Sequence, residues 1–318
     1  MTGTFPSQYH GELYILAGVT ASGKSKVALE WACSNDAEIL SCDSISFYKG
    51  MDIGSAKPSF EERKRVPHHG IDLFEVRDLC DVGRYAEYAR RKVGEIISRG
   101  RKVLVVGGSG FYLQSFFSSM VDEVEIEDSV REQVDHLFNT LGLVGLLQRL
   151  RSLNPGGVGE LDVLNPRRVI RALERCLASG KDLITLKREF DSLPKSFPNF
   201  KKKVLWLNRE DNDLVHRIQD RTQKMLEGGL LDETRTLLKL GLALNPAASS
   251  SIGYREAVSC LQGKVPVCDL NQLINASTRK LVSKQRKWFR KHLNEKSHLV
   301  LNHGQELEGT ELLWDSGT

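Results

Sequence analysis

The 318-residue chain lacks any run approaching the roughly 20 consecutive apolar residues that a membrane-spanning helix requires. Its first residues, 1–11, lack the charged and then apolar character of a secretion signal. The six cysteines are scattered without a C-x-x-C pair. His292 and His298 therefore have no cysteine pair with which to bind a metal, which argues against a zinc site. These absences favour a cytoplasmic protein with free thiols and no membrane partner.

Strand-like patterns are also missing from one internal stretch, residues 121–199, which begins acidic and becomes helical and basic. The first ~115 residues instead alternate apolar runs with amphipathic segments, which is typical of βαβ units in a parallel sheet. A later apolar run, 203–207, predicts another strand of that sheet. The internal stretch therefore interrupts a sheet that the chain later resumes.

We predict an α/β fold whose phosphate-loop core has a parallel sheet and is built from residues 12–120 and 200–292. An inserted all-helical domain occupies residues 121–199. Helical periodicity dominates after residue 207, so the C-terminal part of the core should be helical. Residues 293–318 are polar and weakly patterned, and we expect a disordered tail there.

A complete phosphate-binding loop lies between the first predicted strand and the first predicted helix. Residues 18–25 match G-x-x-x-x-G-K-[ST] in full. Loops of this kind surround a polyphosphate with amide groups, and the following helix adds a favourable dipole. Lys24 is expected to neutralise phosphate charge, and the Ser25 hydroxyl to ligate Mg²⁺. We assign phosphate binding to the whole loop: Gly18, Val19, Thr20, Ala21, Ser22, Gly23, Lys24 and Ser25.

The acid that a nucleotide hydrolase would need is absent from its usual place. Such enzymes hold Mg²⁺ with an aspartate at the end of a buried strand, yet the strand predicted at 102–106 ends in glycines and Ser109. Asp43 is the nearest candidate, because it ends the apolar run 37–42 and ligands gather at the carboxyl ends of parallel strands. Asp43 is placed there to abstract a proton or bind a metal indirectly, unless it is a solvated loop residue or a helix cap.

Basic residues gather in two predicted helices, although the net charge is only +4. Residues 279–291 carry seven cations and no acid, with two aromatic residues among them, which suits a nucleic-acid backbone. The second basic helix begins at Asn165 and places three arginines on one face: Arg168, Arg171 and Arg175. Each helix alone could be a solvated surface, but two of them beside a phosphate loop favour a long polyanion as partner.

These motifs together resemble those of the bacterial tRNA dimethylallyltransferases, also called tRNA isopentenyltransferases. The resemblance follows the family's order across residues 14–290, and this ordered set is far more specific than the phosphate loop alone. The matching blocks are GVTASGKS at 18–25, DSISFYKGMDIGSAKP at 43–58, HHGID at 68–72, GGSGFY at 107–112, NPRRVIRALE at 165–174, HRI at 216–218, IGYRE at 252–256 and KQRKWFR at 284–290.

The resemblance implies transfer of a dimethylallyl group from dimethylallyl diphosphate to the exocyclic amine of an adenine. That adenine lies 3′ of the anticodon in tRNAs reading codons that begin with U. The phosphate loop, with Mg²⁺ on Ser25, then holds the departing diphosphate, so that no hydrolase acid is required. Lys24 and Arg217 would bind the diphosphate, with added hydroxyl contacts from Thr20 and Ser22. Asp43 would accept the amine proton, and Ser109 would line the channel where the two substrates meet.

The resemblance also implies contact with the tRNA anticodon stem-loop, in which the helical insertion takes part. The positions are Asp43, Ser44, Ile45, Ser46, Ser109, Arg131, Arg167, Arg168, Val169, Ile170, Arg171, Ser250, Gly253, Tyr254, Arg255, Lys284, Gln285, Arg286, Lys287, Trp288 and Arg290. Four positions depart from the family pattern: Val19 replaces proline, Ser46 replaces glutamine, Ser109 replaces threonine and Gly70 replaces an apolar residue.

Three other functions remain open. A small-molecule kinase would share the phosphate loop, the Mg²⁺ and a carboxylate base, but it would leave the two basic helices without a use. A related prenyltransferase could act on free AMP. The third alternative, an RNA-binding protein with a vestigial loop, is disfavoured by the intact Lys24, Ser25 and Asp43. For the tRNA enzyme we expect a monomer.

Overall fold

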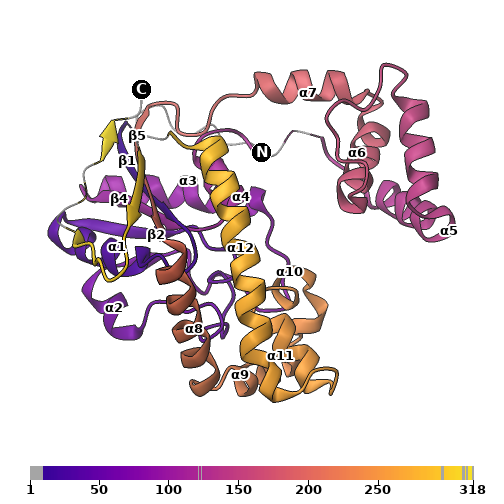
Figure 1. Cartoon of the computed structure of the whole chain (residues 1–318). Coiled ribbons are helices and arrows are strands. Elements are labelled where there is room, and N and C mark those ends of the chain that lie inside the picture. Colours follow the sequence, from indigo (N-terminus) through magenta and orange to yellow (C-terminus); the bar gives the residue numbers. More distant parts are fainter. Residues whose placement is uncertain are drawn as a thin grey trace. The chain divides into compact units, whose positions relative to one another are not determined.

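The computed structural model describes residues 10–120, 122, 124–294, 297–309, 312 and 314–316 (Figure 1). Contacts within the chain divide it into two compact units. One unit consists of residues 118–196, and the larger one of the described parts of 4–117 and 197–318. The sequence prediction had placed the insertion at 121–199. No helix among the described residues is both long and apolar enough to cross a membrane.

The larger unit is built on one sheet with the strand order β3-β2-β4-β1-β5-β6. All neighbours along this path are parallel, which confirms the predicted parallel sheet, and β7 pairs antiparallel with β5. The strands are β1 (Gly11–Gly18), β2 (Ala37–Ser41), β3 (His68–His69), β4 (Lys102–Gly107), β5 (Phe200–Arg209), β6 (His298–Leu301) and β7 (Asp315–Ser316).

Both faces of the sheet are covered, which explains why its strands read as continuous apolar runs. In β1, Leu13 and Ile15 belong to one buried cluster, whereas Tyr14 and Leu16 belong to a second one. This division follows from the alternation of side chains along a strand. The helices of the larger unit are α1 (Lys24–Ser34), α2 (Phe60–Arg65), α3 (Val82–Ser98), α4 (Gly110–Leu113), α8 (Asp211–Glu227), α9 (Leu230–Lys239), α10 (Pro246–Ser249), α11 (Tyr254–Leu261) and α12 (Leu270–His292).

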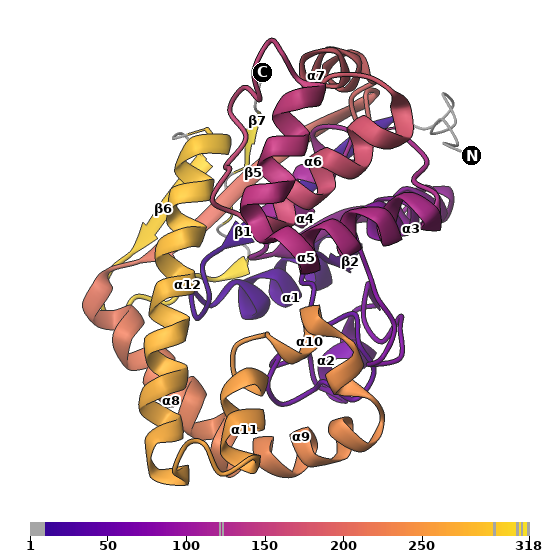
Figure 2. The same cartoon turned by 90° about the vertical axis from the view of Figure 1, so that its right-hand side faces the viewer.

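The C-terminal part of the core is helical, as predicted. A break at Gly229, whose φ is 93°, separates α8 from α9, because glycine adopts this left-handed conformation at little cost. The long helix α12 lies beside α8 (Figures 1 and 2). Helix α8 carries two of the basic side chains, Arg217 and Arg221, that the site below uses.

The smaller unit contains helices and no strand among its described residues. It contains α5 (Asp128–Leu153), with a sharp change of direction at Gly142, α6 (Pro166–Ser179) and α7 (Leu183–Ser192). The start of α6 follows from its sequence, because the Asn165 side chain accepts the Arg168 N–H and Pro166 occupies the first turn. A hydrogen bond of 2.9 Å from Ser196 Oγ to the Ser118 carbonyl joins the two ends of the unit.

The prediction of a disordered tail at 293–318 is wrong for the described part of that segment. β6 (His298–Leu301) extends the sheet by pairing with β5, and Leu301, Leu307 and Leu312 are buried against it. A strand of four residues is too short to show a periodic pattern, so only its partner strand reveals it. Residues 295–296, 310–311, 313 and 317–318 of the predicted tail lie outside the described residues.

Candidate active site

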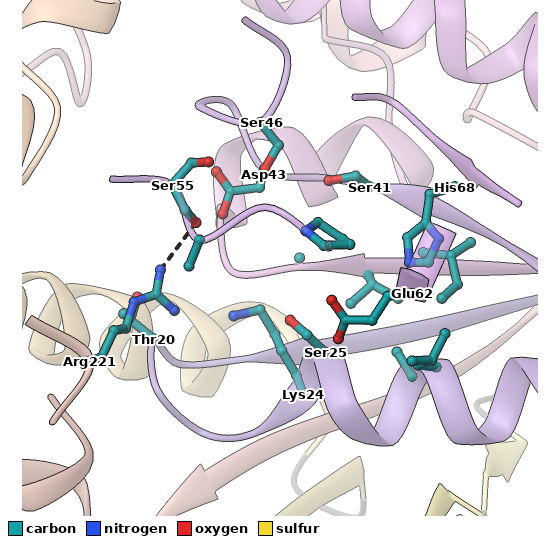
Figure 3. Close-up of a pocket in the computed structure, with 17 residues that line it drawn as sticks. Thr20, Lys24, Ser25, Ser41, Asp43, Ser46, Ser55, Glu62, His68 and Arg221 are labelled. Carbon is teal, nitrogen blue, oxygen red and sulfur yellow. Dashed lines mark hydrogen bonds between the residues drawn. The ribbon is translucent and has the colours of Figure 1, made fainter. Parts of the chain in front are cut away.

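A cavity lies at the carboxyl ends of β1, β2 and β4, next to the start of α1 (Figure 3). Its lining includes Lys24 and Ser25 of the phosphate loop, Asp43 after β2 and Arg221 from α8. The structure therefore brings Asp43 to the phosphate loop, at the edge of an open sheet where ligands bind. The other lining residues are Thr20, Ala28, Leu29, Ile39, Ser41, Ser46, Ser55, Ala56, Pro58, Glu62, His68, Val106 and Gly107.

The backbone of residues 18–25 has the tight curvature of an anion-binding loop. Ala21 and Gly23 both have positive φ values, 65° and 93°. A Cβ atom at Gly18 would lie 2.8 Å from Ser22 Oγ and 3.3 Å from the Leu207 carbonyl oxygen, so only glycine fits against β5 there. The first turn of α1 contains no acid, so nothing within that turn opposes the positive end of the helix dipole.

The hydroxyl groups of Thr20 and Ser22 are not both turned toward the cavity. Ser22 Oγ is buried beneath the loop, close to Gly18, and has no hydrogen-bond partner among the described residues. Thr20 lines the cavity, but both its amide N–H and its hydroxyl bond to Gln285 Oε1, at 2.9 and 3.2 Å. In this geometry Ser22 Oγ makes no contact with the cavity, and the Thr20 hydroxyl proton is already bonded to Gln285.

Asp43 faces two cations across the cavity. Its Oδ1 accepts the Ile45 N–H at 3.1 Å, which holds the carboxylate at the end of β2. Burial lowers the pKa of Lys24 to about 8, while the Asp43 carboxylate opposes this shift and the Arg221 guanidinium adds to it. Burial also lowers the pKa of Arg221, again opposed by Asp43. One carboxylate with two partly desolvated cations leaves the site ready for an anionic ligand.

Two arginines on α8 reach the phosphate loop. Arg217 Nε donates to the Ala21 carbonyl at 3.0 Å, and Arg217 Nη1 lies 3.1 Å from Glu306 Oε1 in the C-terminal segment. Arg221, four residues later and thus on the same face of the helix, donates to the Ser55 carbonyl at 3.1 Å and points toward Lys24 (Figure 3). The sequence prediction named Arg217 and missed Arg221, although this spacing could have identified it.

Ser109 is not among the residues that line this cavity. The family resemblance predicted that it would line the channel where the two substrates meet. It is the half-buried residue before α4, directly after the glycines that end β4. Gly107 is the part of that turn that reaches the cavity. A Cβ at Gly107 would lie 2.3 Å from the Cys42 carbonyl oxygen, so glycine allows β4 to approach β2 just before Asp43.

The residues predicted to contact tRNA differ in their exposure. Exposed positions are Arg131, Arg167, Arg168, Arg171, Ser250, Arg255, Lys284, Lys287 and Arg290. Partly buried positions are Asp43, Ser44, Ile45, Ser109, Ile170, Arg286 and Trp288. Buried positions are Ser46, Val169, Gly253, Tyr254 and Gln285. The Tyr254 hydroxyl, for example, donates to Glu233 at 2.6 Å inside the core, so its contact with a macromolecule would require rearrangement.

The oxygen atoms near the phosphate loop fit a Mg²⁺ site completed by water and a bound phosphate better than a site formed by protein ligands alone. Ser25, Asp43 and Glu62 all line the cavity. However, the described residues contain no group of three or more histidine, cysteine, aspartate or glutamate side chains that could hold a metal. Mg²⁺ usually keeps several waters and takes its remaining ligands from one or two side chains and a phosphate, which these residues allow.

The lowered pKa of Lys24 predicts a pH dependence of anion binding. Lys24 is charged below about pH 8 and loses its charge above it, so the affinity for inorganic pyrophosphate should fall between pH 8 and pH 9.5, by up to about tenfold per unit. Calorimetry with Mg²⁺ present measures this directly. Lys24→Arg keeps its charge throughout and should lack this decline. An identical pH profile in both proteins would show that Lys24 does not titrate in this range.

The chain is similar to known proteins over most of its length. The family model described as IPP transferase matches residues 46–292. A protein of Opitutus terrae named tRNA dimethylallyltransferase is 48% identical over 281 residues, which span 88% of this chain and 90% of that protein.

Two solved structures are similar to the whole fold. The full-length tRNA isopentenylpyrophosphate transferase of Bacillus halodurans has 29% identity and a TM-score of 0.65, over 92% of this chain and 89% of its own. A eukaryotic dimethylallyltransferase described as acting on tRNA has 26% identity and a TM-score of 0.78, over 92% of this chain and 74% of its own.

Proposed function

The chain belongs to the IPP transferase family, and from this premise we propose that it transfers a dimethylallyl group to tRNA. The resemblance seen in the sequence motifs is thereby confirmed, and the chain is a prenyltransferase. The donor we propose is dimethylallyl diphosphate, and the acceptor is the exocyclic amine of the adenine 3′ of the anticodon in tRNAs reading U-initial codons. The products are isopentenyladenosine in tRNA and diphosphate.

The phosphate loop serves the leaving group in this reaction. As the allylic C–O bond breaks, negative charge grows on the diphosphate. The amides of Ala21 and of residues 23–25, the Lys24 ammonium and the two α8 arginines supply positive charge that is already in place. Preorganised charge of this kind is often the largest contribution to catalysis. Mg²⁺, held through Ser25, would neutralise further diphosphate charge when bound.

Asp43 serves the acceptor. The lone pair of an adenine amine is delocalised into the ring, so the amine is a weak nucleophile until it loses a proton. In the proposed step the new N–C bond forms, the C–O bond breaks, and Asp43 takes the proton from nitrogen. The observation that carries this assignment is that Asp43 lines the same cavity as Lys24 and Ser25.

The exposed arginines of α6 and the exposed cations of α12 support tRNA as the acceptor. These side chains form two basic surfaces, one in each unit, that can neutralise backbone phosphates. The target base lies in a single-stranded loop, where bases can be splayed out and read on their edges. An enzyme acting on such a base must take it out of the stack before Asp43 can reach its amine.

A single assay separates the candidate functions. Purified protein is incubated with Mg²⁺ and labelled dimethylallyl diphosphate, together with unmodified tRNA, with AMP or with no acceptor. We expect label in the tRNA alone. Label on AMP alone would identify a nucleotide prenyltransferase instead, and ATP-dependent phosphorylation without prenyl transfer would identify a kinase.

A further inference from the structure

Gln285 lies in the basic helix α12 but does not share its surface. Its neighbours Lys284 and Lys287 are exposed, whereas Gln285 is only 9% exposed and turns toward the phosphate loop. The helix thus has a cationic outer face, while the Gln285 side chain lies inside the larger unit. No other residue of this helix touches the phosphate loop through a hydrogen bond among the described contacts.

The hydrogen bonds of Gln285 fix the orientation of its amide. The Thr20 N–H can only donate, so the atom facing it must be Oε1, at 2.9 Å. The Gly108 carbonyl can only accept, so the atom facing it must be Nε2, at 2.9 Å. The Thr20 hydroxyl, 3.2 Å from Oε1, must then donate its proton to Gln285 and present a lone pair to the cavity.

The two backbone segments that Gln285 joins both border the site. Thr20 belongs to the phosphate loop, and Gly108 follows β4 next to Lys24, whose Nζ would lie 3.7 Å from a Cβ added at Gly108. Such a Cβ would lie only 2.7 Å from Gln285 Nε2, so the absence of a side chain makes room for the amide. One helical turn further on, Trp288 packs against Gly110, where an added Cβ would come within 2.2 Å of its ring.

We propose that Gln285 is a positioning residue that couples tRNA bound on the outer face of α12 to the shape of the phosphate loop. The inference rests on the proposed function and deepens it by assigning Gln285 to the donor side of the site, behind the RNA surface. RNA phosphates on Lys284 and Lys287 fix the position of α12. The amide between those lysines then fixes Thr20 and Gly108 around the donor diphosphate.

Coupling of this kind is reciprocal. If tRNA tightens the binding of the diphosphate, the diphosphate must tighten the binding of tRNA by the same factor. The usual range for such factors is about 5- to 150-fold. Gln285 makes three hydrogen bonds to two segments, so its loss should remove most of the coupling and leave each separate binding site in place.

The test compares the dissociation constant of pyrophosphate, with Mg²⁺, in the absence and presence of unmodified anticodon stem-loop RNA, using the full chain. We expect the RNA to tighten pyrophosphate binding at least about fivefold in the unaltered protein. Gln285→Met, which keeps the size but not the hydrogen bonds, should reduce this factor to about twofold or less. The affinity for RNA alone should stay within about twofold, since the lysines remain. Gln272→Met, an exposed glutamine of the same helix, is the matched control and should retain full coupling.

Two results with the Gln285→Met variant would overturn the proposal. One is full coupling in Gln285→Met, and the other is a loss of RNA affinity of tenfold or more in that variant alone, which would make Gln285 a direct RNA contact. Absence of coupling in the unaltered protein, with both ligands bound, rejects this inference and leaves the proposed function intact. Failure of the unaltered protein to bind either ligand would reject both this inference and the proposed function. If circular dichroism shows that Gln285→Met is unfolded, Gln285→Glu decides: it keeps the Thr20 bonds but cannot donate to Gly108, so unchanged coupling would reject the idea.

Discussion

Replacing Asp43 with alanine is expected to slow prenyl transfer by about 10²–10⁴-fold, the usual contribution of a general base. The reason is that the adenine amine would have to lose its proton without an acceptor at the carboxyl end of β2. Single-turnover rates with saturating donor and tRNA measure this step. The Asp43 carboxylate also raises the pKa of Lys24. The rates of the two proteins should therefore be compared at pH 7, where Lys24 is protonated in the unaltered protein.

Two further variants make the Asp43 result specific. Asp43→Asn preserves the size and an oxygen for the Ile45 N–H, yet it cannot take a proton, so it should be nearly as slow as the alanine variant. Asp36→Asn removes an exposed carboxylate that precedes the other end of β2 and should leave the rate unchanged. A rate within threefold of normal in Asp43→Asn would exclude Asp43 as the base.

Replacing Arg221 with methionine is expected to lower the transfer rate by about 10²–10³-fold, the range for losing one preorganised donor to developing charge. Arg221 borders the cavity, is desolvated and faces Asp43, so its charge acts there with little screening by water. Binding of tRNA should change little. Rates and RNA affinity are measured on the same preparation.

The Arg221 prediction is separated from a general structural effect by its controls. Arg221→Lys restores a charge without the planar guanidinium and should recover part of the rate. Arg235→Met removes an exposed arginine of α9 and should have no effect. If Arg221→Met lowered only the melting temperature while the rate in the folded protein stayed normal, Arg221 would serve merely to hold the Ser55 carbonyl.

The features that could be predicted from sequence are those encoded over a few neighbouring residues. The loop at 18–25 carries its own glycines, and the start of α6 carries both its cap at Asn165 and Pro166. The strand β4 is a continuous apolar run because both faces of the sheet are covered. In each case the local pattern and the final environment agree, so the interpretation needed no knowledge of distant partners.

The features that escaped prediction depend on partners far away in the sequence. Strand β6 is defined by β5, roughly 90 residues earlier in register, and its own four residues resemble any short apolar stretch. Arg221 looks like one more surface arginine on a charged helix until the fold places it beside Asp43. Gln285 and Tyr254 fall within blocks that suggested RNA contact, and only their burial shows that they are bonded inside the core.

The hydrogen bond between Ser118 and Ser196 means that the chain enters and leaves the helical unit at neighbouring points. Inserting or removing such a cassette leaves the order of the sheet strands untouched, since no strand connection is rerouted. The helical unit, for which we propose contact with the anticodon stem-loop, can therefore change in length or be replaced without altering the sheet that carries the candidate active site. A shortened chain in which a small turn joins Ser118 to Ser196 would be a natural starting point for building minimal or retargeted versions of the protein.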